Sequence, residues 1–153
     1  MIHVIFICTG NICRSAMADW YLKKRLKDLN LEDRVKVTSA GTHTLGDEKA
    51  TDYAKKAIEK YGADIKDHKS TAINESNILE ADYILVMTNR HKQDVIAKYN
   101  QVAEKVHLMK EYIENQDYMD IDDPWGFNMN IYEKCAKEIV ECTEEFIKRE
   151  LLK

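Results

Sequence analysis

Cys8-Thr9-Gly10-Asn11-Ile12-Cys13-Arg14-Ser15 lies between a short apolar run and a segment of helical composition, and this connection determines the expected fold. The apolar run, Ile2 to Ile7, is rich in β-branched and aromatic residues and predicts a buried strand. Turn residues follow, of which Gly10 is the one free to adopt a positive φ. A helix is expected from Ser15 onward. The connection therefore carries a thiol at its start and a guanidinium at its end.

This connection has the chemistry of an anion site. The first turn of a helix offers unpaired backbone N–H groups, and a tight loop directs further N–H groups into the same concavity. Such a site holds either a phosphate group or the thiolate of Cys8, and it favours the thiolate over the thiol. Arg14 adds a planar guanidinium that fits two phosphoryl oxygens, which a lysine cannot do. Ser15 is placed to donate a hydrogen bond to the sulfur.

We therefore predict a nucleophile inside a phosphate cradle, with Cys8 and Arg14 as catalytic residues. The other residues of the loop are expected to contact the substrate: Thr9, Gly10, Asn11, Ile12, Cys13 and Ser15.

The composition is that of a soluble protein, and we expect one domain over residues 1–153. A net charge of −4 provides no general attraction to nucleic acid or to an anionic membrane, so neither is an expected partner, and a monomer is expected. The first apolar run is too short for a signal peptide, and no run approaches membrane-spanning length. A cytoplasmic location is the expectation that follows.

The four cysteines are too few and too unevenly placed for a secreted disulfide scaffold. They include no Cys-x2-Cys pair, and the five histidines are scattered, so neither a metal site nor a cofactor is predicted. Cys135 and Cys142 are seven residues apart in an amphipathic run and are expected to share one buried helix face.

Four apolar or alternating runs predict strands, at residues 2–7, 34–38, 82–87 and 106–109. Helices are predicted over residues 15–29, 52–61 and 91–100, and a last helix from Asn128 with apolar positions at Ile131, Cys135, Ile139, Cys142 and Phe146. This alternation predicts an α/β fold, a doubly wound open sheet of four parallel strands flanked by helices. Ligands of such sheets bind at the carboxyl ends of the strands, where the phosphate-binding loop after the first strand must lie.

A thiolate that attacks phosphorus must expel a leaving group, so the chain should also carry a proton donor. Asp123 is the candidate, in an acidic segment where Asp120 and Asp122 would favour its protonated form. By spacing alone, an ordinary turn at Asp123-Pro124 is the stronger interpretation.

Cys-x5-Arg followed by Ser, in the form CTGNICRS directly after the first strand, resembles the signature of the low-molecular-weight protein tyrosine phosphatase family. The similarity covers nearly the whole chain, including residues 39–42, residues 81–88 and Asp123-Pro124. The resemblance implies a cysteine-dependent phosphatase that acts on phosphorylated proteins through a phosphocysteine intermediate. Inorganic phosphate would be its product, and no metal or cofactor would be needed.

The resemblance also implies roles for residues outside the loop. Asp123 matches the family's general acid, which then serves as general base. Trp125 matches an aromatic at the mouth of the pocket, with a core position as the alternative. Asn11, Ser39 and His68 match positions whose hydrogen bonds brace the loop, with an ordinary surface histidine as the alternative for His68.

The chain departs from the family pattern in two places. Ala16 stands where the family usually has proline, which loosens the start of the helix. The loop around Thr44 and Leu45 lacks an aromatic residue that family members often present opposite the loop carrying Asp123, here called the Asp loop. This weakens the expectation that a flat aromatic substrate is bound tightly.

Residue 12 bears on the substrate. In the family, a branch resembling bacterial protein-arginine phosphatases carries threonine here, whereas tyrosine phosphatases carry isoleucine. Ile12 packs on an aromatic leaving group and offers nothing to a guanidinium, so phosphotyrosine is the favoured substrate and phosphoarginine the alternative. The segment from Met87 to Lys92 resembles the bacterial branch in general.

Two other classes are less favoured. A thiol-relay arsenate reductase needs two more cysteines near the end of the third strand, and residues 86–98 contain none. A non-catalytic phosphate-binding module would not need both Cys8 and Asp123. The sequence allows two roles for Cys13. It can form a reversible disulfide with Cys8 within the loop, or it can be purely structural.

Overall fold

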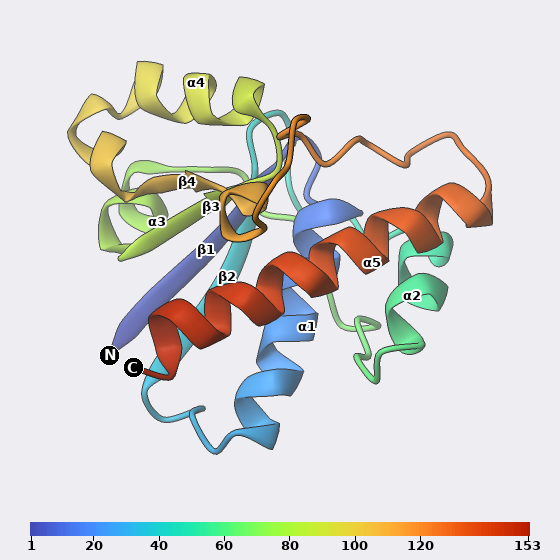
Figure 1. Cartoon of the computed structure of the whole chain (residues 1–153). Helices are drawn as coiled ribbons and strands as arrows, with labels where there is room; N and C mark the ends of the chain where they lie inside the picture. The colour runs from blue at the N-terminus through green and yellow to red at the C-terminus, as the bar shows by residue number, and fades with distance from the viewer.

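The sheet that carries the loop has four parallel strands in the order β2-β1-β3-β4 (Figure 1). The computed structural model describes all residues, 1–153. The strands are β1 Ile2–Cys8, β2 Val35–Gly41, β3 Tyr83–Val86 and β4 Val106–Leu108. Each lies at a predicted position, although β2 continues through residues predicted to form a turn. Cys8 pairs in register with Gly41, so both strands end at the site.

The helices flank the sheet as the alternating pattern predicts. They are α1 Arg14–Asp28, α2 Asp52–Glu59, α3 Glu75–Glu80, α4 Asn89–Lys98 and α5 Met129–Phe146, with short helical turns η1 Asn100–Lys105, η2 Met109–Tyr112 and η3 Ile147–Leu151. In Figure 1, α1, α2 and α5 lie on one side of the sheet and α3 and α4 on the other. The doubly wound α/β fold is confirmed.

Alternation along β1 produces two cores. Val4 and Phe6 pack in the cluster under α1 and α5, whereas Ile5 and Ile7 pack in the smaller cluster under α3 and α4. All four side chains are fully buried, as expected for a central strand covered on both faces. This double burial fixes the strand end at which Cys8 begins the loop.

The closing helix differs from its predicted pattern at one position. Cys135 and Cys142 do share the buried face of α5. Ile131 is instead exposed, because the buried face begins at Tyr132, one residue further along.

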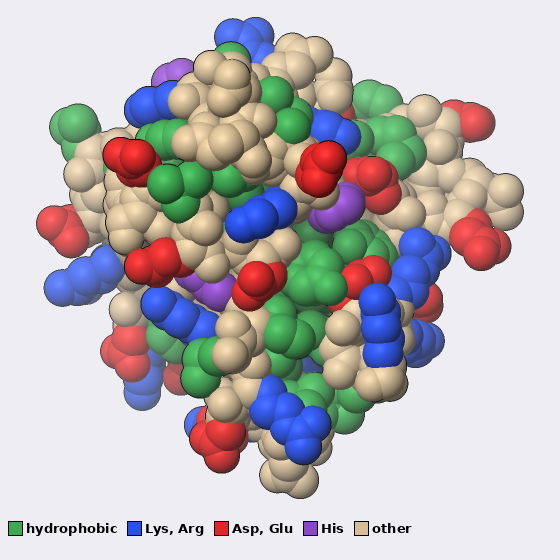
Figure 2. Space-filling view, turned by 90° about the vertical axis from the view of Figure 1, so that its left-hand side faces the viewer, with side chains coloured by type: hydrophobic (Ala, Val, Ile, Leu, Met, Phe, Trp, Pro, Cys, Tyr) green, Lys and Arg blue, Asp and Glu red, His purple; other side chains and the backbone are tan.

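The surface carries no dominant charge of one sign on the face shown in Figure 2, where acidic and basic side chains are interspersed. No helix is both long and apolar enough to cross a membrane.

Candidate active site

The loop between β1 and α1 curls around the sulfur of Cys8. Asn11 adopts the left-handed conformation, with φ of 57°, and its backbone N–H lies 3.3 Å from Cys8 Sγ. We expected Gly10 to supply the positive φ, but Asn11 does so, since asparagine tolerates this region better than other side chains. The glycine required by close packing is Gly41 on β2, where a Cβ would stand 2.5 Å from the carbonyl oxygen of Thr9.

Two hydrogen-bond donors converge on the nucleophile. Besides the Asn11 N–H, the hydroxyl of Ser15 lies 2.9 Å from Cys8 Sγ. The side-chain amide of Asn11 donates to Ser15 Oγ at 2.7 Å, which leaves the Ser15 proton free to point at the sulfur. Both donors face the sulfur, where they can stabilise the negative charge of a thiolate leaving group during the reaction.

Arg14 connects the loop to the segment that carries Asp123. Its Nη1 donates to the carbonyl of Ile121 at 2.8 Å, and its Nη2 lies 3.8 Å from Asp123 Oδ2. The guanidinium is buried, yet its Nε has no hydrogen-bond partner within the protein. A buried charged donor without a partner is rare, and a phosphoryl oxygen above Cys8 would satisfy it.

Asp123 is held at the rim of the site. Its side chain is 53% exposed, and its Oδ1 accepts the backbone N–H of Trp125 at 3.0 Å. The neighbouring carboxylates have other partners: Asp120 accepts the Asn89 N–H, and Asp122 accepts the Tyr118 hydroxyl. Asp123 therefore forms an ion pair with Arg14. The sequence had predicted instead that the charges of Asp120 and Asp122 would dominate its surroundings.

A cavity of about 170 Å³ opens over the sulfur. It is lined by Cys8, Thr9, Gly10, Ile12, Cys13, Arg14, Asp123 and Trp125. Trp125 is 63% exposed, which excludes the core alternative for this residue. Asn11 and Ser15, predicted to contact substrate, are fully buried behind the loop and lie outside this lining, because their side chains bind the loop itself.

Two of the three residues expected to brace the loop by hydrogen bonds, Asn11 and His68, do so, whereas Ser39 has another partner. His68 Nε2 lies 2.6 Å from the carbonyl of Asn11, so the surface-histidine alternative is wrong. Ser39 instead donates to the buried carboxylate of Asp19 on α1. The backbone N–H of Thr71 binds Asn11 Oδ1 at 3.0 Å, a contact across 60 residues that leaves no trace in the sequence pattern.

His91, for which the sequence predicted no role at the site, supports the other end of the loop. Its Nε2 lies 2.9 Å from Thr9 Oγ1, and its Nδ1 accepts the Thr88 N–H at the start of α4. Burial and the nearby charge of Arg14 lower the pKa of His91 to about 4, so the ring is neutral at physiological pH. The capping pattern of Thr88 followed three residues later by His91 was the available signal.

The remaining cysteines do not suit a thiol relay. Cys135 and Cys142 are buried in α5, and burial raises the pKa of both thiols, to about 12 for Cys142. Cys13 is buried beside Tyr132 and Thr51, and burial raises its pKa as well.

Comparison with known proteins agrees with this geometry. The family model described as "Low molecular weight phosphotyrosine protein phosphatase" matches residues 3–153. The chain is 35% identical to a protein-arginine-phosphatase of Bacillus subtilis over 147 residues, 95% of each chain. It is 30% identical to the low molecular weight phosphotyrosine protein phosphatase of Rattus norvegicus, over 95% of this chain and 94% of that one.

Solved structures show the same similarity. A crystal structure of a YwlE mutant from Bacillus subtilis is 32% identical, covers 100% of both chains and superposes with a TM-score of 0.90. The protein is therefore a cysteine-dependent phosphatase that belongs to the low molecular weight phosphotyrosine protein phosphatase family.

Proposed function

We propose that this phosphatase hydrolyses phosphotyrosine in proteins. The observation that carries the proposal is the cavity over Cys8, whose two large apolar side chains are Ile12 and Trp125. An aromatic ring in this cavity would bury apolar surface against these side chains. A guanidinium in the same place would find one carboxylate, that of Asp123.

The geometry supports a reaction in two steps. Cys8 attacks phosphorus in line, while the N–H groups of the loop and the Arg14 guanidinium stabilise the equatorial oxygens. As the phosphorus–oxygen bond breaks, Asp123 donates its proton to the leaving oxygen. Water, deprotonated by Asp123, then attacks the phosphocysteine. Inorganic phosphate is released, and the departing thiolate recovers its hydrogen bonds from Ser15 and Asn11.

Protein-arginine phosphatase is the second candidate, favoured by the 35% identity to the Bacillus subtilis enzyme. The decisive measurement is kcat/KM for matched peptides that carry phosphotyrosine or phosphoarginine. We expect the phosphotyrosine peptide to be hydrolysed faster. A tenfold or greater preference for phosphoarginine would replace the proposal with the second candidate. If neither peptide were hydrolysed, both candidate functions would be excluded.

Ile12→Thr should reduce the preference for phosphotyrosine. The substitution removes apolar contact with the ring and adds a hydroxyl that can accept from a guanidinium, so kcat/KM for phosphotyrosine should fall about tenfold. The ratio of phosphoarginine to phosphotyrosine turnover should rise. Ile12→Val is the matched control, since it stays apolar and loses one methylene. Equal effects of the two substitutions on that ratio would show that residue 12 does not select the substrate.

Cys13→Ser should make inactivation by peroxide harder to reverse. Peroxide oxidises the Cys8 thiolate to a sulfenic acid, and the Cys13 thiolate can displace hydroxide from it to form a disulfide. Because burial raises the pKa of Cys13, this step should accelerate from pH 6.5 to 8.5 as the thiolate forms. Activity recovered with dithiothreitol should be high in the native protein and in Cys135→Ser, and low in Cys13→Ser. Equal recovery in all three would exclude the disulfide.

A further inference from the structure

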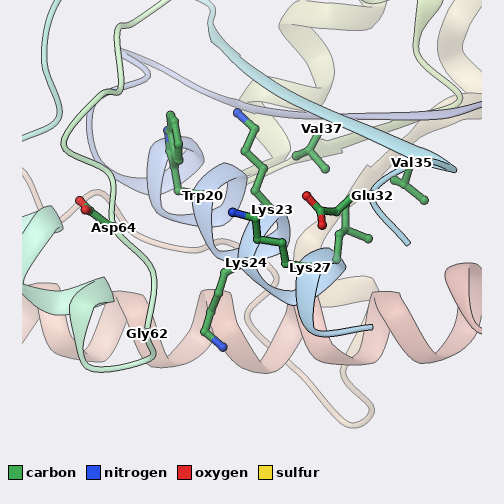
Figure 3. A pocket seen from close by; sticks show the side chains of 10 residues that line it. Trp20, Lys23, Lys24, Lys27, Glu32, Val35, Val37, Gly62 and Asp64 are labelled. Atoms are coloured by element: carbon green, nitrogen blue, oxygen red, sulfur yellow. The ribbon is translucent and has the colours of Figure 1, made fainter. Parts of the chain in front are cut away.

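Trp20 occupies a position on α1 from which it reaches the brace of the catalytic loop. Its indole Nε1 donates to His68 Nδ1 at 3.0 Å, and the two rings meet edge to face. The indole is half-buried and lines a cavity of about 590 Å³ between α1 and β2. Figure 3 shows Trp20 and Lys23 projecting from the same side of α1, with Lys24 directed the other way toward Gly62.

This contact determines where the proton of His68 lies. An indole N–H is a donor only, so Nδ1 must present its lone pair and the neutral ring must carry its proton on Nε2. Nε2 faces the carbonyl of Asn11 at 2.6 Å, and a carbonyl is an acceptor only. Trp20 and Asn11 therefore specify the same tautomer from opposite sides of the ring.

The backbone conformation of Asn11 matters to the nucleophile, because it links the carbonyl that binds His68 to the N–H that faces Cys8. Asn11 is in the left-handed region, a conformation that needs support from its surroundings. Its N–H faces Cys8 Sγ, and its side chain orients Ser15 toward the same atom. A change at the Asn11 carbonyl is thus transmitted to both donors that face the sulfur.

We propose that Trp20 is a positioning residue for the nucleophile: its indole N–H fixes the tautomer and orientation of His68, and through it the backbone of Asn11, whose N–H faces Cys8. The inference rests on the proposed phosphatase reaction, but not on which phosphorylated residue is the substrate.

Removal of the indole N–H leaves a buried acceptor without a partner. The ring can relieve this by rotating or by taking a second proton on Nδ1, and either change alters its bond to Asn11. In the native protein burial lowers the pKa of His68, while the charges acting on it are Asp19, which raises the pKa, and Lys23, which lowers it, both from α1. Trp20→Phe keeps an aromatic ring and removes the donor together with the five-membered ring that carries it.

The first test is spectroscopic and does not depend on activity. Long-range proton–nitrogen spectra of the native protein at pH 7 should show His68 protonated on Nε2 alone. In Trp20→Phe the imidazole should titrate at a higher pH, because Nδ1 is free to accept a proton. Native His68 protonated on Nδ1, or a titration unchanged by the substitution, would overturn the proposal. Lys24→Met, in the same cavity, should leave the spectrum as it is.

The second test is a double-mutant cycle on turnover. Trp20→Phe should lower kcat for an aryl phosphate about two- to tenfold, as expected for one lost hydrogen bond. It should have no further effect in His68→Ala, since the indole then has nothing to position. Additive losses would show that Trp20 acts through packing and not through His68. If the native protein hydrolyses no phosphate ester, the proposed function fails while the tautomer test still decides the role of Trp20.

Discussion

Cys8→Ser is expected to abolish turnover of every phosphorylated substrate while the fold is retained. A serine hydroxyl is a far weaker nucleophile than a cysteine thiol and is a poorer leaving group in the second step, although it would face the same donors, Ser15 and Asn11. Loss of a catalytic nucleophile costs on the order of 10⁴-fold or more in kcat. Hydrolysis of an aryl phosphate, followed with enough enzyme to detect such a residue of activity, measures the loss.

Binding of inorganic phosphate to the same variant separates the nucleophile from its cradle. Arg14 and the N–H groups of the loop remain, and one negative charge has been removed, so calorimetry should show phosphate bound at least as tightly as by the native protein. Cys142→Ala, in the core of α5, serves as the control and should keep its activity. Turnover above about a hundredth of the native rate would show that Cys8 is not the nucleophile. Loss of phosphate binding would show that the loop needs the sulfur to keep its phosphate-binding conformation.

The parts of this site that lie within a few residues of each other could be predicted from the sequence. Cys8, Arg14 and Ser15 belong to one strand-loop-helix connection, whose residue types fix both the local backbone and its chemistry. The strands were predictable for the same reason, because a short run such as Ile2 to Ile7, rich in β-branched and aromatic residues, favours a buried strand. α3 was not, since its six residues span too few turns to establish a helical period.

The contacts that hold the loop in shape come from distant segments and could not be predicted. Thr71 binds Asn11 through a backbone N–H, which any residue type supplies. Trp20 and His91 each bind through a ring nitrogen whose partner is set by tertiary packing. Ser39 shows the converse, because a correct residue type at a matching position pairs with Asp19 instead. Local chemistry identifies Cys8 and Arg14, and the family resemblance adds Asp123, whereas the donors that orient the loop depend on the completed fold.

Asp123→Asn is expected to lower kcat/KM by about 10²–10⁴-fold for substrates with poor leaving groups. Asparagine keeps the oxygen that accepts the Trp125 N–H, so the Asp loop should hold its shape while the transferable proton is lost. The loop is also held through Ile121, whose carbonyl accepts from Arg14 independently of residue 123. The variant thus separates proton transfer from loop position.

The size of the loss should depend on the leaving group. Phosphotyrosine and phosphoarginine both expel a basic atom that needs a proton, so both should be affected strongly. An activated nitrophenyl phosphate expels a stable anion, so its kcat/KM, which reports formation of the phosphocysteine, should fall far less. Its kcat should still fall, and the phosphocysteine should accumulate, because the same residue activates water in the second step. The matched control is Asp122→Asn, because the native Asp122 carboxylate binds Tyr118. This variant should change kcat less than about threefold. If Asp123→Asn lowered kcat/KM equally for all three substrates, Asp123 would be acting on the charge of Arg14 rather than as the proton donor, since only proton transfer in the first step distinguishes one leaving group from another.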